Sequence, residues 1–344
     1  MPGIEQTNTT SHTVSWRCPS NIAIVKYWGK KDNQIPCNAS LSMTLSQAYT
    51  ETTLTFSNKK TVGEIEMDYY FEGKKHLSFE ERIKKYLKDQ HGYFPILEHH
   101  AIKIESQNSF PHSAGIASSA SAFGALALAL LDASGTGTKD KEFLKRASQL
   151  ARLGSGSACR SVYGGYSVWG YVDSVPGSSD EFATPLADVH DNFKKLHDAI
   201  IIVDDRAKAV SSSLGHSLMK GHPYAETRFK QANSRVADLV KILGAGDYES
   251  FIKLAESEAL TLHAMMMTSS DYYLLLKPGS LVAIDKIQAF RRDTNIPICF
   301  TLDAGPNLHV LYPDAYRDKV EDFLKFSFDN IIFDTIGTGP EKLR

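Results

Sequence analysis

The sequence contains few cysteines, and they lie far apart. Four occur among 344 residues, at positions 18, 37, 159 and 299, and no two of them form a CxxC pair. A disulfide framework or a zinc knuckle requires numerous or closely spaced cysteines, so we expect neither. The composition suits a reducing compartment, and we expect a cytoplasmic protein.

The sequence also lacks a long apolar run and a large net charge. Its longest apolar stretch, residues 120–131, is rich in alanine and shorter than the roughly 18 to 20 residues that a membrane span requires. Residues 1–14 are polar and do not resemble a secretory signal. The formal net charge of −2 argues against a nucleic-acid or membrane partner, so any anion site must be local.

Hydrophobic periodicity predicts an α+β protein. Alternating residues indicate half-buried strands early in the chain, and short apolar runs indicate buried strands later. The expected strands are residues 50–56, 65–71, 166–171, 200–203 and 298–302. The expected helices are residues 80–90, 119–131, 139–153, 191–198, 226–243, 248–267 and 282–294. A cluster of Pro, Gly, Ser and Asp at 173–181 interrupts the pattern, so we divide the chain into domains at residues 1–190 and 191–344.

A loop rich in serine precedes the apolar helix. Residues 111–120 read PHSAGIASSA, so Gly115 permits a tight backbone path and the hydroxyls of Ser118 and Ser119 stand at the start of the helix. Free N–H groups and the helix dipole at this position favour phosphate. Simple N-capping is the alternative interpretation, because serine is a preferred N-cap.

Three further segments carry polar groups suited to anions or to phosphoryl chemistry. Residues 21–30 read NIAIVKYWGK and place Lys26 and Lys30 around an aromatic pair and a glycine. Residues 154–161 read GSGSACRS and present Arg160, whose planar guanidinium suits a carboxylate or phosphate. Residues 301–307 read TLDAGPN and place Asp303 between a strand and a turn. Surface lysines, a helix-to-strand turn and an Asx-turn are the respective structural alternatives.

Together the four segments resemble the signature set of the diphosphomevalonate decarboxylases, which belong to the GHMP kinase superfamily. Residues 208–215, KAVSSSLG, are similar to that family's KxVSS segment. The resemblance implies a ribosomal protein S5 domain 2-like N-terminal domain that binds ATP, a ferredoxin-like C-terminal domain, and an active site in the cleft between them. It also implies a homodimer.

The implied reaction is the ATP-dependent decarboxylation of mevalonate 5-diphosphate to isopentenyl diphosphate, through phosphorylation of the 3-hydroxyl. This is a step of isoprenoid biosynthesis in the mevalonate pathway, and the implied cofactors are ATP and Mg²⁺. Asp303 would act as a general base or an orienting carboxylate, Lys26 would stabilise the transferring phosphoryl group, and Arg160 would hold the substrate carboxylate.

Other matched residues have binding roles by the same resemblance. Further contacts to the substrate are expected from Tyr27, Lys30, Ser155, Ser157 and Ser212. Contacts to ATP are expected from Ser113, Ala114, Gly115, Ile116, Ala117, Ser118, Ser119 and Lys208. Ser118 or Ser119 would also help to place the metal.

Some positions depart from the family pattern. Ala39 stands where many relatives have serine, residues 112–113 replace the commoner Thr-Ala, and His216 stands where methionine is usual. No proposed catalytic group is lost. These departures leave room for a related kinase or decarboxylase that acts on mevalonate or mevalonate 5-phosphate.

Other function classes have weaker support. A serine or cysteine hydrolase lacks the GxSxG elbow, and a non-catalytic nucleotide-binding protein would not need Asp303. The pair His99 and His100 lacks metal-ligand spacing. His263 lies at helical spacing with apolar residues and suits a core position as well as a site position.

Overall fold

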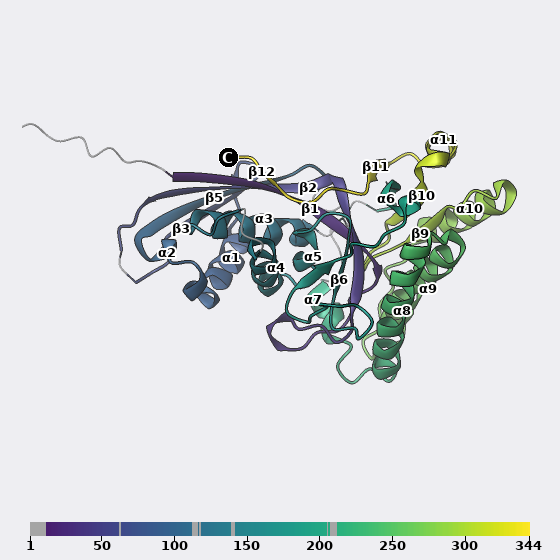
Figure 1. The fold of residues 1–344 in the computed structure, drawn as a ribbon, viewed down its shortest axis with the longest axis horizontal. Helices are drawn as coiled ribbons and strands as arrows, with labels where there is room; N and C mark the ends of the chain where they lie inside the picture. The colour runs from purple at the N-terminus through teal and green to yellow at the C-terminus, as the bar shows by residue number, and fades with distance from the viewer. Residues whose placement is uncertain are drawn as a thin grey trace, which may run out of the picture.

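The computed structural model describes residues 12–344 except 62, 112–115, 117, 139–141, 205 and 207–211, together with the side chains of 212 and 213. Two β-sheets organise the described residues, and they lie side by side along the long axis of the molecule (Figure 1). The larger sheet is built mainly from the first half of the chain and the smaller sheet from the second half.

The larger sheet has eight strands. In the order of the sheet they are β12 (Glu341–Lys342), β1 (His12–Val25), β2 (Ser40–Asn58), β5 (His100–Asn108), β3 (Met67–Phe71) and β4 (Lys74–Lys75), while β6 (Tyr166–Trp169) pairs with β2 and with β7 (Ala183–Pro185). From residue 48 to residue 56, β2 alternates between buried and partly exposed side chains, as the sequence predicts for a sheet with one covered face. Residues 40–45 of the same strand are buried on both faces.

Helices cover one face of this sheet. They are α1 (Leu77–Asp89), α2 (Ile96–His99), α3 (Ser118–Ala133), α4 (Phe143–Gly154) and α5 (Ala158–Ser161), with short 3-10 turns η1 (Asp32–Gln34) and η2 (His91–Tyr93). The apolar α3 is the expected core helix and packs on β1 and β2. α4 ends at Gly154, where a side chain would collide with the ring of Phe123, because a Cβ there would lie 2.0 Å from Cδ1.

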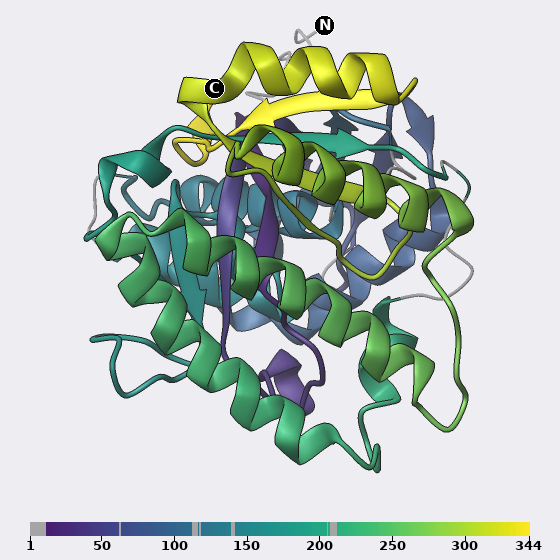
Figure 2. The ribbon, with the colours of Figure 1, turned by 90° about the vertical axis from the view of Figure 1, so that its right-hand side faces the viewer.

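The smaller sheet has four antiparallel strands. In the order of the sheet they are β11 (Ile331–Thr335), β8 (Leu196–Ile201), β10 (Leu308–Pro313) and β9 (Cys299–Thr301). The remaining elements are α6 (Asp191–Lys194), α7 (Ser212–Ser217), α8 (Ala225–Ala245), α9 (Tyr248–Met267), α10 (Pro278–Thr294), η3 (Asp314–Tyr316) and α11 (Arg317–Ser327). Figure 2 shows α10 and α11 lying across the outer side of this sheet.

One sequence prediction in this region is wrong. The expected helix at residues 191–198 ends at Lys194, and Leu196 already begins strand β8. Charged residues made the segment look helical, whereas the carboxylate of Asp198 is buried against His309 at 2.6 Å. Tertiary pairing therefore overrides local propensity here. The other expected strands and helices are present, with bounds shifted by a few residues. Residues 139–141, at the start of the expected helix 139–153, lie outside the described residues.

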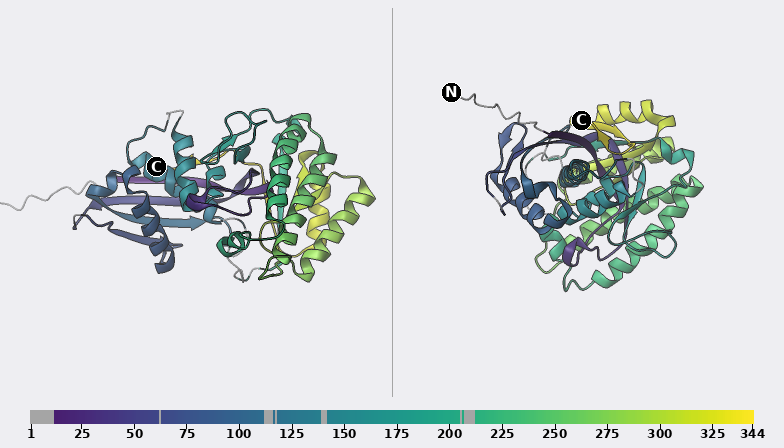
Figure 3. Two further views of the ribbon diagram at one scale, coloured as in Figure 1. Left: turned by 90° about the horizontal axis from the view of Figure 1, so that it is seen from below. Right: turned by 60° about the vertical axis from the view of Figure 1, so that its left-hand side comes forward.

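A single apolar core joins the two sheets. It contains Leu41 and Met43 of β2, Leu239 of α8, and Ile200 and Leu311 of the smaller sheet. α8 and α9 cross the end of the β1–β2 hairpin, as the view from below shows (Figure 3). The larger sheet and the second half of the chain therefore pack against each other near the end of β1.

The chain also returns to the first sheet near its end. β12 pairs with β1 through Trp16 and Arg17. Gly164 and Gly337 allow this return, because a Cβ on either would lie 2.2 Å from a main-chain oxygen of the opposite segment. Among the described helices, none combines the length and the apolar composition needed to cross a membrane.

The carboxylate of Asp334 in β11 links the smaller sheet to the larger sheet by hydrogen bonds. Its carboxylate accepts hydrogen bonds from the main-chain N–H groups of Ser46 (2.8 Å), Gln47 (2.8 Å) and Ala48 (2.7 Å) in β2, and from Thr335 (2.7 Å). Burial raises the pKa of Asp334, and the main-chain donors oppose that rise.

We expect Asp334→Ala to destabilise the protein by about 2 kcal/mol or more, since each buried N–H group that loses its acceptor costs roughly 1–3 kcal/mol. Urea unfolding would measure this loss, with Asp322→Ala, which removes an exposed carboxylate of α11, as the matched control. Equal urea midpoints of unfolding for the two variants would show that the hydrogen bonds of Asp334 between the sheets do not stabilise the protein.

Candidate active site

A buried ion pair joins the two halves of the molecule. Nζ of Lys26 lies 2.8 Å from Oδ1 of Asp303, and the lysine side chain is 1% exposed whereas the aspartate side chain is 30% exposed. Lys26 follows β1 directly and Asp303 stands two residues after β9. The structure therefore brings together two of the three residues predicted to be catalytic, and it leaves the carboxylate accessible to a reactant.

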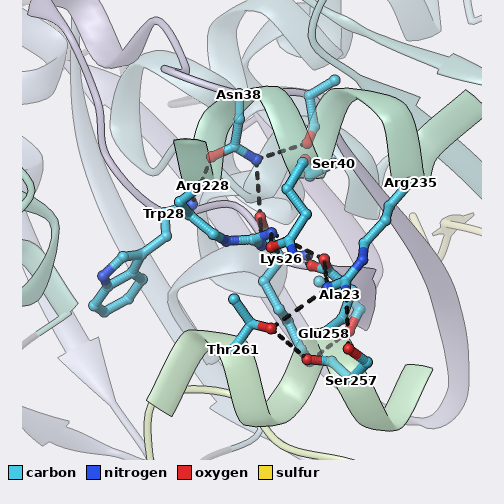
Figure 4. Close-up of polar contacts among 12 residues, drawn as sticks. Ala23, Lys26, Trp28, Asn38, Ser40, Arg228, Arg235, Ser257, Glu258 and Thr261 are labelled. Carbon is cyan, nitrogen blue, oxygen red and sulfur yellow. Dashed lines mark hydrogen bonds and ion pairs between the residues drawn. The ribbon is translucent and has the colours of Figure 1, made fainter. Parts of the chain in front are cut away.

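The main chain of Lys26 is held by a network of buried polar groups (Figure 4). Its N–H donates to Oε2 of Glu258 at 3.0 Å, and its carbonyl accepts from Nδ2 of Asn38 at 2.9 Å. Glu258 is fully buried and is bound by Arg228 and Arg235, each at 2.7 Å. Burial alone would raise the pKa of Glu258, but the arginines hold it below its ordinary value.

Burial lowers the pKa of Lys26, and the charge and hydrogen bond of Asp303 oppose that fall. A buried ammonium without a partner would be costly. The ion pair with Asp303 offsets this cost, and the carbonyl of Ala23 accepts a further hydrogen bond from Nζ at 2.5 Å. A positive charge is thereby held at a fixed point beside a partly exposed carboxylate.

Arg160 is the third residue of the predicted catalytic set. It lies in α5, is 2% exposed, and donates through Nε to Oδ1 of Asn21 at 3.4 Å and through Nη1 to the hydroxyl of Ser40. Its guanidinium lies 5.8 Å from the ring centroid of Trp169. Burial lowers its pKa, and the nearby Cys159 and Asp303 oppose this fall. Its two contacts use only two of five N–H donors.

A second cationic region lies near the start of α3 and the end of α4. The hydroxyls of Ser119 and Ser155 are 3.2 Å apart. Arg82 donates to the carbonyl of Gly154 at 3.1 Å, and its charge acts with burial to lower the pKa of Lys30. Two cations and two hydroxyls thus gather where the serine-rich segments meet, and a multiply charged anion would neutralise the repulsion between the cations.

Tyr27 packs between the two regions. Its ring lies 4.6 Å from that of Trp169 and 4.3 Å from that of His216. Its hydroxyl is buried, and no described residue hydrogen-bonds to it. Gly156 leaves room for this hydroxyl, since a Cβ at Gly156 would lie 2.8 Å from it. A buried hydroxyl without a partner is a point where a ligand oxygen could bind.

Several predicted ligand contacts fall outside the described residues. These are Ser113, Ala114, Gly115, Ala117 and Lys208, together with the side chain of Ser212. Ser118 is the first residue of α3, and Ile116 buries its side chain in the core, so only its main chain could face a phosphate. Ser157 precedes α5, and its carbonyl accepts from Asn21 at 3.3 Å.

Sequence reasoning missed several residues that the structure adds to the site. Glu258 and Arg228 lie on two of the predicted helices, and only the fold shows that these charged side chains are buried. Arg82 lies on α1, far along the chain from the serine-rich segments. His263, which the sequence leaves open between a core and a site position, is 1% exposed, and burial together with the charge of Lys26 lowers its pKa to about 4.

Comparisons with known proteins agree with the family resemblance. The model of the diphosphomevalonate decarboxylase-like N-terminal domain matches residues 18–183, and that of the mevalonate 5-diphosphate decarboxylase C-terminal domain matches residues 199–342. The diphosphomevalonate decarboxylase of Saccharomyces cerevisiae is 30% identical over 340 residues, which cover 94% of this chain and 83% of that protein.

Solved structures give the same result. Mevalonate diphosphate decarboxylase from Staphylococcus aureus superposes with a TM-score of 0.85 at 33% identity, covering 97% of this chain and 99% of that chain. MDDEF in complex with MVAPP, AMPPCP and magnesium superposes with a TM-score of 0.84 at 30% identity, covering 97% and 100%. The chain therefore belongs to the diphosphomevalonate decarboxylase family, and it is an enzyme with the two-domain α+β fold of the GHMP kinases.

Proposed function

We propose that this enzyme converts mevalonate 5-diphosphate and ATP into isopentenyl diphosphate, ADP, phosphate and CO₂. The observation that carries this proposal is the Lys26–Asp303 ion pair, with Arg160 held close enough for its charge to act on Asp303. A carboxylate, an ammonium and a guanidinium are the groups that phosphoryl transfer to a hydroxyl beside a carboxylate requires.

The first step takes place at Asp303. Its partly exposed carboxylate would accept the proton of the substrate 3-hydroxyl or orient that hydroxyl for attack on the γ-phosphorus of ATP. The new O–P bond forms as the bond to ADP breaks. Lys26 would stabilise the charge on the transferring phosphoryl oxygens, because its ammonium is fixed and shielded from water.

The second step depends on Arg160. A guanidinium held by Asn21 and Ser40 can bind the substrate carboxylate with its remaining donors. When the C3–O bond breaks and phosphate leaves, the electron pair of the C–CO₂ bond moves to form the double bond, and CO₂ departs. No base is needed for this elimination, so the protein mainly has to hold the geometry.

The diphosphate of the substrate would occupy the second cationic region. Lys30 and Arg82 supply the positive charge, and the hydroxyls of Ser155, Ser157 and Tyr27 supply hydrogen bonds. Ser212, at the first position of α7, would add a further contact.

ATP would bind at the loop that leads into α3. Ser113, Ala114, Gly115, Ile116, Ala117, Ser118, Ser119 and Lys208 are the residues that we assign to it. α3 has 16 residues, so its N-terminus carries a helix dipole suited to phosphate.

Magnesium would bind together with the phosphates of ATP. Within the described residues, no group of three or more His, Cys, Asp or Glu side chains could hold a metal ion by itself. The hydroxyls of Ser118 and Ser119 fit an ion that keeps several waters and takes phosphate oxygens. Bound there, magnesium would supply charge neutralisation of the phosphates.

The proposal also covers the domain boundary, the cellular location and the oligomeric state. We divide the protein at residue 190 into an N-terminal ATP-binding domain, 1–190, and a C-terminal domain, 191–344. We place it in the cytoplasm, which the four unpaired cysteines favour. We also propose a homodimer, as in the family, which light scattering of the purified protein would test.

The reaction itself is tested with purified protein, Mg-ATP, and mevalonate, its 5-phosphate or its 5-diphosphate in separate assays. We expect ADP and CO₂ to appear in equal amounts from the diphosphate alone. Asp303→Asn should lower kcat by about 10³-fold or more, because it removes the carboxylate charge while keeping the shape. ADP without CO₂, or turnover of another acceptor, would show a kinase or a relative of different specificity.

Arg160→Lys tests recognition of the substrate carboxylate. Lysine keeps the charge but loses the planar fork, so we expect kcat/KM for the diphosphate to fall on the order of 100-fold. Arg317→Lys, a change on the exposed start of α11, is the control. An unchanged kcat/KM in Arg160→Lys would exclude bidentate binding of the substrate by this side chain.

Tyr27→Phe separates substrate binding from stability. The hydroxyl has no partner among the described residues, so its removal should leave the melting temperature unchanged or slightly raised. If this hydroxyl binds a substrate oxygen, KM for the diphosphate should rise roughly 5- to 20-fold, as expected for one lost hydrogen bond. A lower melting temperature with an unchanged KM would show that the hydroxyl is structural.

A further inference from the structure

The turn at residues 31–35 follows Lys30 directly and contains two left-handed residues. Asn33 has φ 54° and ψ 32°, and Gln34 has φ 58°. Residues with a side chain rarely adopt this region, because Cβ crowds the main chain there. The 3-10 turn η1 within this segment buries no side chain, so core packing does not enforce the conformation. It therefore depends on hydrogen bonds.

Arg152 of α4 attaches this turn to the helix. Its Nη1 donates to the carbonyl of Asn33, and its Nε donates to the carbonyl of Glu181 at 2.7 Å. The arginine is 6% exposed, whereas Asn33 is exposed. Both of these hydrogen bonds go to main-chain oxygens rather than to a carboxylate. A guanidinium bound in this way fixes the position of the turn relative to α4 without being neutralised.

The left-handed conformation of Gln34 accompanies a contact to Lys30. Oε1 of Gln34 accepts a hydrogen bond from Nζ of Lys30 at 3.1 Å. Glycine would adopt the same backbone conformation without strain, but it would remove this acceptor. Strain that persists for the sake of a side chain points to a functional position. Because the amide is neutral, it orients the ammonium and leaves its charge available for an anion.

The end of α4 connects this turn to the second cationic region. Arg152 stands two residues before Gly154, the last residue of α4, whose carbonyl accepts from Nη2 of Arg82 at 3.1 Å. Ser155 follows directly. Burial lowers the pKa of Lys30, and the charge of Arg82 acts in the same direction, as expected for cations that lie near each other. One helix end therefore holds the segment of Lys30 and the other groups of this region in a common frame.

We propose that Arg152 is a positioning residue for recognition of the substrate diphosphate, and that it acts on Lys30 through the left-handed turn and the amide of Gln34. The inference rests on the proposed function, since it takes the diphosphate as the ligand of Lys30. Arg152 acts without touching the ligand, because its hydrogen bonds fix the main chain of the turn. Lys30 supplies the charge, and Gln34 sets the place of its ammonium.

Dissociation constants for mevalonate 5-diphosphate, measured by titration calorimetry, provide the first test. Arg152→Met keeps an unbranched apolar stem and removes both hydrogen bonds, so we expect binding to weaken about tenfold. In a Lys30→Met background the same change should weaken binding by less than about twofold, because the path through Lys30 is already broken. Arg146→Met, at an exposed position of the same helix, is the matched control and should bind like the wild type.

Gln34→Leu tests the same path from its other end, and it serves also if Arg152→Met does not fold. Leucine keeps the bulk and removes Oε1, so we expect binding to weaken roughly 3- to 10-fold, as for one lost hydrogen bond. Gln34 is partly exposed, so the melting temperature should not fall. An unchanged dissociation constant in Gln34→Leu would overturn the proposal. A tenfold loss from Arg152→Met that persists in the Lys30→Met background would also overturn it, since Arg152 would then act by another route.

Hydrogen exchange of the ligand-free protein tests the turn directly. The N–H groups of Lys31 and Ile35 donate within the turn, at 2.8 and 3.1 Å. We expect these amides to exchange about tenfold faster in Arg152→Met and at the wild-type rate in Arg146→Met. Equal exchange in Arg152→Met and the wild type would overturn the proposal. A wild-type protein that binds the diphosphate without decarboxylating it would disprove the proposed reaction, while the binding and exchange data would still decide the role of Arg152.

Discussion

The ion pair between Lys26 and Asp303 is the interaction on which the site depends. It joins residues separated by 277 positions in the sequence, one from the end of a strand in each sheet. The pair can form only if the two sheets keep a fixed relative position, which the shared core and the main-chain contacts of Asp334 provide. The arrangement of the proposed catalytic groups is therefore a consequence of how the two halves pack.

Burying so many charges requires that each one is compensated. Glu258 is bound by two arginines and by the main chain of Lys26, while Lys26 is bound by Asp303. Buried ion pairs contribute little net stability, since desolvation offsets the attraction, but loss of one partner is strongly destabilising. The network therefore serves mainly to hold one geometry, and Asp303, whose side chain is 30% exposed, is its most exposed member.

The sequence predicts much of the fold because local patterns carry it. The alternation at residues 50–56, the apolar stretch at 120–131 and the helix at 248–267 all appear in the structure. The expected helix at 191–198 failed because the burial of Asp198 depends on His309, more than a hundred residues away. Segments whose state is decided by distant partners cannot be recognised from their own residues.

The same distinction applies to the site. Lys26, Arg160 and Asp303 could be predicted because they lie in recognisable segments, and the structure pairs Lys26 with Asp303 at 2.8 Å. Glu258 and Arg82 were not found, because each contributes through a contact between elements distant in sequence. His216 is instructive, since it departs from the family pattern yet fits the site. Burial lowers its pKa to about 3, so its neutral Nδ1 accepts the N–H of Gly29 at 3.0 Å while its ring packs between Tyr27 and Trp28. An imidazole at this position therefore ties α7 to the turn that carries both lysines and preserves the packing around Tyr27.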